Sequence, residues 1–253
     1  MQYLNKVNLG NTLWWSPWFG CDKVSSACQN CFIKIRDFRL ADIYGTEQID
    51  KAPEGTIIIT SVLTDFFWEA ADEYRNLAWK FIREHPHLIF LIITKRLEHG
   101  RLVLPEDWGN GWDNVIISVT VDNNEVSEER ISQLRDFPAK HKWLSCAPLV
   151  SPMNISSYLA EGWIEHVESS GEIGDVNHIR ETRIEWVRDL LAQCKQHNVR
   201  FSFMKCGKKF VVDNSQTLLD SASCYHSKMS DDFELSYYTP LVFNLTTGGN
   251  III

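Results

Sequence analysis

The sequence predicts an α/β fold in which parallel strands form a complete or partial (β/α) barrel. Short apolar runs alternate with helical patterns, several of these runs are apolar almost throughout, and the chain has 253 residues. Continuously apolar strands are typical of parallel sheets covered on both faces, and strands that alternate with helices indicate right-handed crossovers. At about 250 residues a barrel is the natural closed form, with an open doubly wound sheet as the alternative.

Seven runs rich in β-branched or aromatic residues are short enough to be strands. In chain order they are Leu13–Trp18, Ile57–Ser61, Leu88–Thr94, Val115–Val121, Lys142–Ala147, Ile164–Glu168 and Arg200–Lys205. Helical spacing of apolar residues lies between these runs. We expect helices over Tyr74–Ile82, after a cap at Ser127, after a capping box of Thr182 and Glu185, and over Cys28–Ile43.

The pattern changes near residue 209, which divides the chain into two expected parts. Residues 1–209 form the barrel domain, with a cysteine-bearing loop at 20–32. Residues 210–253 contain only short strand-like pieces, at Phe233–Tyr238, Leu241–Leu245 and Asn250–Ile253, separated by turn signals. We interpret this second part as a C-terminal extension or lid.

Charge and hydropathy narrow the function classes. The net charge is −8, from 25 basic and 33 acidic residues, which disfavours general nucleic-acid binding. The densest basic spot, Lys205–Lys209, is more simply a solvated turn than a phosphate site. No segment approaches the roughly 18–20 apolar residues of a membrane span, and the first residues lack the apolar core of a signal peptide. We therefore expect a cytoplasmic protein without a membrane partner.

Three cysteines, Cys21, Cys28 and Cys31, form a C-x6-C-x2-C array. The array follows the first predicted strand, at the rim where α/β barrels keep their active sites. Clustered cysteines in a chain without an export signal indicate metal binding or catalysis. A [4Fe–4S] cluster on three cysteines keeps one iron open, whereas zinc needs a fourth ligand, such as His178, His226 or Cys224. Spacing and placement alone leave a cluster, zinc and unligated thiols equally open.

Polar residues at or just after the ends of predicted strands are further candidates for the site, because catalytic groups of a barrel gather at that rim. They are Ser61, Asp65, Lys95, Asp122, Glu172 and Lys205. Helix capping or loop solvation would account equally well for Asp65 and Glu172. An ordinary salt bridge would account for Lys95 and Lys205.

The cysteine segment, with Trp15, Pro17, Asn30 and Phe32, resembles the "WNP…GC…S.GC.NCY" opening of a phage-associated, radical-SAM-like family of unassigned biological function. The resemblance extends over about 190 residues, and its strength lies in the shared order of the motifs. The further matching segments are Ile59–Phe67, Ile93–Arg96, Ser118–Arg130, Leu144–Leu149, Ser170–Gly174, Glu185–Arg188 and Phe203–Gly207.

The resemblance implies a radical-SAM enzyme that binds a [4Fe–4S] cluster on the three cysteines and S-adenosylmethionine at the open iron. An electron donor would reduce the cluster, and a 5′-deoxyadenosyl radical would take a hydrogen atom from a small-molecule or nucleotide-derived substrate. We expect Asp65, Lys95 and Asp122 to be catalytic. The cofactor-binding candidates are Phe32, Ser61, Glu172 and Lys205.

The chain departs from the family pattern at several positions. Ala147 stands where the pattern has Glu, Ser170 replaces a Gly, and the C-x6-C-x2-C spacing differs from the commoner C-x3-C-x2-C. In that commoner array an aromatic before the third cysteine packs on adenine, whereas here Asn30 precedes Cys31 and Phe32 follows it. Two other hypotheses therefore stand: a zinc-stabilised binding protein, and a degenerate member without catalysis.

Overall fold

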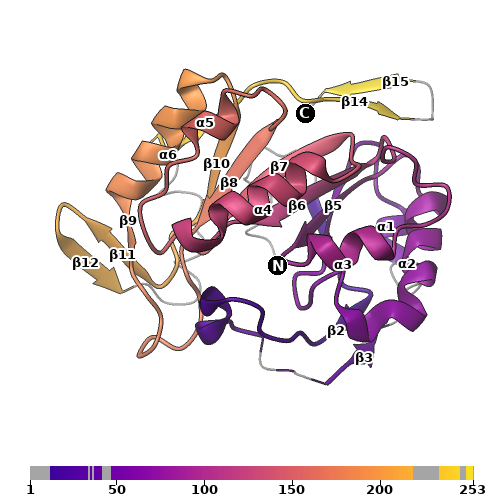
Figure 1. Ribbon diagram of the computed structural model, residues 1–253, viewed down its shortest axis with the longest axis horizontal. Helices are drawn as coiled ribbons and strands as arrows, with labels where there is room; N and C mark the ends of the chain where they lie inside the picture. Colours follow the sequence, from indigo (N-terminus) through magenta and orange to yellow (C-terminus); the bar gives the residue numbers. More distant parts are fainter. Residues whose placement is uncertain are drawn as a thin grey trace.

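The chain folds as an α/β protein around a mostly parallel eight-stranded sheet curved into a half-barrel (Figure 1). The computed structural model describes residues 12–33, 35, 37–41, 47–218, 234–245 and 249–252. The strand order is β1-β4-β5-β6-β7-β8-β10-β13, so that sequential strands lie side by side. The first seven strands are parallel, and β13 runs antiparallel to β10 at one edge.

The strands of this sheet lie close to the predicted runs, which confirms them as strands. Their bounds are β1 (Thr12–Trp15), β4 (Ile57–Thr60), β5 (Ile89–Thr94), β6 (Val115–Thr120), β7 (His141–Cys146), β8 (His166–Ser170), β10 (Arg200–Lys205) and β13 (Ser236–Tyr237). Smaller pairings join β2 (Trp18–Phe19) to β3 (Arg39–Leu40), and β11 (Lys209–Val212) to β9 (Thr182–Arg183) and β12 (Ser215–Leu218).

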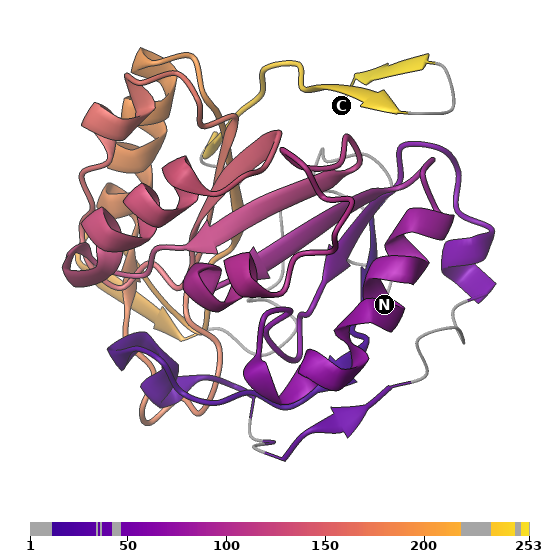
Figure 2. The same cartoon turned by 45° about the vertical axis from the view of Figure 1, so that its right-hand side comes forward.

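Helices cover the outer face of the half-barrel (Figures 1 and 2). They are α2 (Asp72–Glu84), α3 (Leu97–Leu102), α4 (Asn124–Asp136), α5 (Ser156–Leu159) and α6 (Ile184–Gln196), with the short α1 (Glu47–Asp50) near α2. The main core packs between them and the sheet, and includes Ile58, Phe90, Ile117, Leu144 and Phe201 from successive strands. No helix in the described ranges is long and apolar enough to cross a membrane.

The inner face of the half-barrel has a separate apolar core near the amino ends of the strands. Ile57, Ile89, Ile116 and Trp143 belong to this second core. The C-terminal hairpin of β14 (Val242–Leu245) and β15 (Gly249–Ile252) covers it, and the ring of Phe243 lies 4.3 Å from that of His141. The hairpin and β13 thus join the segment after residue 209 to the sheet.

Two expectations about helix starts are wrong. The cap of α4 is Asn123, whose side chain accepts from the backbone N–H groups of Glu125 and Val126, whereas Ser127 lies inside the helix. Thr182 does not cap α6, because its hydroxyl donates to the carbonyl of Leu149. Both residues are typical caps in sequence, and tertiary contacts decide where their hydroxyls bond.

The expected helix over Cys28–Ile43 is also wrong. Only Ser26–Asn30 is helical, as a short 3₁₀ helix (η1), and Cys31 is already extended. The following chain turns back to form β3, which pairs with β2, and the N–H of Cys21 bonds to the carbonyl of Ile35. These pairings occupy backbone groups that a helix would need. Ile43 lies outside the described residues.

We predict that Phe243→Ala lowers the free energy of unfolding by about 3–5 kcal/mol, as for other buried Phe→Ala changes. The reason is that Phe243 is fully buried between the hairpin and the inner face of the sheet. Urea denaturation measures the loss. Val242→Ala is the matched control in the same strand, because Val242 is exposed, and it should change stability by less than about 0.5 kcal/mol. Equal effects of the two changes would contradict the packing described here.

Candidate active site at the carboxyl ends of the strands

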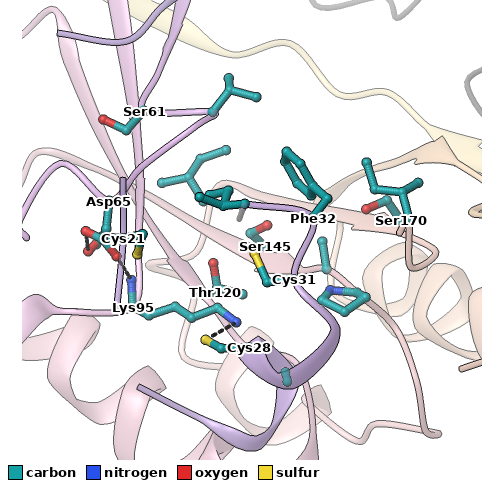
Figure 3. Close-up of a pocket in the computed structure, with 18 of the residues that line it drawn as sticks. Cys21, Cys28, Cys31, Phe32, Ser61, Asp65, Lys95, Thr120, Ser145 and Ser170 are labelled. Carbon is teal, nitrogen blue, oxygen red and sulfur yellow. Dashed lines mark hydrogen bonds between the residues drawn. The ribbon is translucent and has the colours of Figure 1, made fainter. Parts of the chain in front are cut away.

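A cavity of about 300 Å³ opens at the carboxyl ends of the parallel strands (Figure 3). It brings together most of the residues that the sequence singled out as a site. Those on its wall are Cys21, Cys28, Cys31, Phe32, Ser61, Asp65, Lys95, Glu172 and Lys205. Asp122 lies just behind the wall and is fully buried, with Lys95 as its partner. Segments far apart in sequence therefore converge at one place, as parallel strand ends do in this class of fold.

The cysteine loop is fixed to the rim by its backbone. Gly20 has φ +102° and packs so closely that a side chain would lie 2.6 Å from the carbonyl of Asp37. Its own carbonyl accepts from the hydroxyl of Thr64, at 2.6 Å. The N–H of Cys28 bonds to the carbonyl of Ser25, and that of Cys31 to the carbonyl of Cys28. The loop therefore presents its cysteines from a defined backbone.

A second loop, which follows β8, fastens the cysteine loop from the other side (Figure 1). The amide of Asn30 donates to the carbonyl of His178, at 2.7 Å. The guanidinium of Arg180 reaches the carbonyl of Ala27, at 3.4 Å. The side chain of His178 itself is exposed and pairs with Asp175, and it is not among the cavity-lining residues.

The three thiols differ in electrostatic environment. Burial, with the nearby Asp65 carboxylate, raises the pKa of Cys21 to about 11. Burial also acts to raise the pKa of Cys28, but the Lys95 ammonium and hydrogen bonds from the loop outweigh it and hold that pKa below its usual value. The Nζ atom of Lys95 lies 3.8 Å from the Cys28 sulfur, and the Ser25 hydroxyl lies 3.5 Å from it.

Lys95 owes its position to a buried ion-pair network. Asp122 receives Lys95 at 2.7 Å and Arg130 at 3.2 Å, and its same oxygen accepts from the Ser25 hydroxyl at 3.3 Å. A buried carboxylate needs such partners, since an unpaired one would be very costly. The network joins the end of β5, the end of β6 and the cysteine loop.

The remaining predicted carboxylates are engaged by the protein itself. Asp65 accepts from the hydroxyl of Thr94 at 2.7 Å and from the backbone N–H groups of Phe67 and Lys95. Both oxygens of Glu172 bond to Arg180. These contacts fit structural roles for the two side chains, which shape the rim on opposite sides of the cavity.

The cysteines suit a metal by donor chemistry and by common access to one cavity. The six cysteines in the described ranges, these three included, are reduced thiols. Among the described residues that line the cavity there is no fourth cysteine and no histidine, which matches a cluster with three protein ligands better than closed tetrahedral zinc. In the described part of the chain no three His, Cys, Asp or Glu side chains are already gathered as a ligand set. Cys224 and His226 lie outside the described residues.

Sequence reasoning missed several residues of the site. Arg180 and Arg130 anchor carboxylates there, while Thr120, Ser145 and Glu168 line the inner wall of the cavity. The last three carry a readable signal, because each is a polar residue at an alternate position within an otherwise apolar strand. Strand residues of one parity face the same side of a sheet. A polar residue recurring at that parity on neighbouring strands indicates a lined cavity.

We predict that Lys95→Met raises the pH at which Cys28 becomes reactive. In cluster-free protein, Cys28 should be half-maximally alkylated by iodoacetamide at lower pH than an ordinary thiol, because the Lys95 ammonium favours its thiolate. Cys21 should need a pH near 11. Peptide mass spectrometry across a pH series measures both. Lys51→Met, which removes an exposed ammonium on a distant helix, is the control. An unchanged Cys28 profile in Lys95→Met would contradict the electrostatic account.

Comparison with known proteins gives one match. No curated protein and no solved structure matches the chain significantly. A family model matches residues 10–232, which include the cysteine loop and every strand that contributes to the cavity. The chain therefore belongs to the family described as "Protein of unknown function (DUF5131)".

Proposed function

We propose that the protein is a radical-SAM enzyme whose [4Fe–4S] cluster is held by Cys21, Cys28 and Cys31. One observation carries the proposal: three reduced thiols from one loop share a cavity at the carboxyl edge of a parallel half-barrel. When bound, such a cluster passes one electron from a donor to S-adenosylmethionine and so supplies a 5′-deoxyadenosyl radical for hydrogen abstraction.

The protein's own residues would orient the reactants and exclude water. Lys95 places a positive charge beside Cys28, and this charge favours the thiolate that a metal requires. Phe32 is 39% exposed and lies on the cavity wall, where its ring can pack against an adenine. Ser61 and Lys205 line the same cavity and offer a hydroxyl and an ammonium to polar groups of the cofactor.

A second candidate function is a binding protein that has lost the chemistry. The observation that favours it is the place of Ala147, which lies on the cavity wall where the resembling family carries a carboxylate. Without that carboxylate, the protein could hold a cofactor and substrate yet lack one contact needed for cleavage. This candidate shares the fold and the cavity with the first and differs only in turnover.

We predict that anaerobic reconstitution with iron and sulfide yields a brown protein with broad visible absorbance, and that reduction with dithionite then converts S-adenosylmethionine to 5′-deoxyadenosine. Cys28→Ala should lose both properties, because it removes one of three ligands. Cys194→Ala, a buried cysteine on α6, should keep both.

The outcomes separate the candidates. A colourless protein that binds zinc in place of iron would contradict the cluster. A brown protein that perturbs its paramagnetic resonance signal on adding S-adenosylmethionine, yet releases no 5′-deoxyadenosine, would support the non-catalytic candidate.

A further inference from the structure

A row of polar side chains crosses the inner wall of the cavity on three neighbouring strands. Thr120 of β6 lies opposite Ser145 of β7, and Ser145 lies opposite Glu168 of β8. All three line the cavity, as does Ser170, two residues after Glu168 on the same face. Figure 3 shows the hydroxyls of Thr120 and Ser145 in the middle of the cavity wall, beyond the cysteine loop. We call Thr120, Ser145 and Glu168 the polar row.

The rest of the cavity differs in character. Trp14, Ile59, Ile93 and Phe32 give it apolar surface from β1, β4, β5 and the cysteine loop. Polar groups on that side are engaged within the protein: the Thr60 hydroxyl donates to the carbonyl of Leu91 at 3.0 Å, and Asp65 is held as described above. The cavity therefore offers hydrogen bonds mainly along one wall and apolar contact along the other.

Glu168 is the unusual member of the row. It is only 7% exposed, and burial raises its pKa, although the Ser145 hydroxyl and the Lys205 charge oppose the increase. A buried carboxyl inside a β-strand reduces stability relative to an apolar residue of similar size. Small-molecule sites typically combine apolar walls with a few such convergent polar groups. The position of Glu168 is thus better suited to binding than to packing.

The distribution of polar groups selects a class of ligand. A sugar presents hydroxyls around its whole rim, and the apolar wall would leave many of them without partners. A planar heterocyclic base has two apolar faces and one hydrogen-bonding edge, and proteins read such bases by stacking and by bonds to that edge. A carboxyl accepts from a ring N–H, and serine or threonine hydroxyls donate to an adjacent carbonyl.

We propose that the polar row binds a nucleobase-like heterocycle that carries a ring N–H next to a carbonyl, with the N–H donating to Glu168 and the carbonyl accepting from Ser145 or Thr120. Aromatic and aliphatic side chains of the opposite wall contact the face of the ring. The binding itself depends only on this cavity. That the bound heterocycle is the substrate of the enzyme rests on the function proposed above.

The test uses full-length, cluster-free protein and isothermal titration calorimetry with three probes. Uridine carries the ring N–H and carbonyl, 3-methyluridine lacks the N–H, and adenosine presents a different edge. We expect uridine to bind at least about tenfold more tightly than either, since one unmet hydrogen bond to a charged or buried group is worth about that factor. Glu168→Leu should weaken uridine binding by a similar factor.

Two controls separate binding from folding. Glu168→Leu should not lower the melting temperature, because it replaces a buried carboxyl by an apolar side chain and leaves only the half-exposed Lys205 without that charge. Glu128→Leu removes an exposed carboxylate on α4 and should leave uridine binding unchanged.

Several results would overturn the proposal. They are no uridine binding up to about 1 mM, equal binding of uridine and 3-methyluridine, or a Glu168→Leu protein that binds like the wild type. Adenosine binding that is as strong as that of uridine and depends on Glu168 would also overturn it, because the row would then recognise the adenosyl group of a cofactor. Iron uptake without uridine binding refutes only this inference, whereas uridine binding without iron uptake refutes only the proposed function.

Discussion

The structure depends on one constraint: the strands of a parallel sheet are apolar on both faces, and both faces must be covered. Helices cover the outer face and form the main core. On the inner face the C-terminal hairpin covers the second core, near the amino ends of the strands. The cavity lies on the same inner face, toward the carboxyl ends. The C-terminal hairpin thereby limits the site to one end of the half-barrel.

The cysteine loop is the second element that defines the site, and its attachments come from three directions. Thr64 holds it from the chain after β4, Asp122 holds it from the end of β6, and Arg180 and Asn30 join it to the loop after β8. Close backbone contact supports the last of these. A side chain at Gly171 would come within 2.0 Å of the Cys206 carbonyl, so that glycine lets the ends of β8 and β10 meet. The thiols are therefore presented by a loop whose surroundings are buried and hydrogen-bonded.

Charge within the site is locally balanced in a chain whose net charge is −8. Lys95, Arg130 and Arg180 each neutralise a carboxylate at the rim or behind it. Ion pairs of this kind position groups more than they add stability. The consequence is a cavity in which thiols, one ammonium group and the polar row occupy separate parts of the wall.

The sequence alone determined the order and nearly all the positions of the parallel strands, because their apolar runs are continuous and bounded by turns. It also indicated that the cysteines and strand-end residues would share a rim, since parallel strands place their carboxyl ends on one edge. The pattern misled where local signals compete with distant partners: Thr182 bonds to Leu149, and the segment after Cys31 pairs with β2 in place of forming a helix.

Only the tertiary structure decided which partner each polar group has and which strand residues face the cavity together. Glu172 looked like a ligand contact but is held by Arg180, and Glu168 looked like an ordinary strand residue but lies in register with Ser145 on the cavity wall. The physical reason is that hydrogen bonds and strand register join residues distant in sequence, whereas hydrophobic periodicity is written locally in the chain.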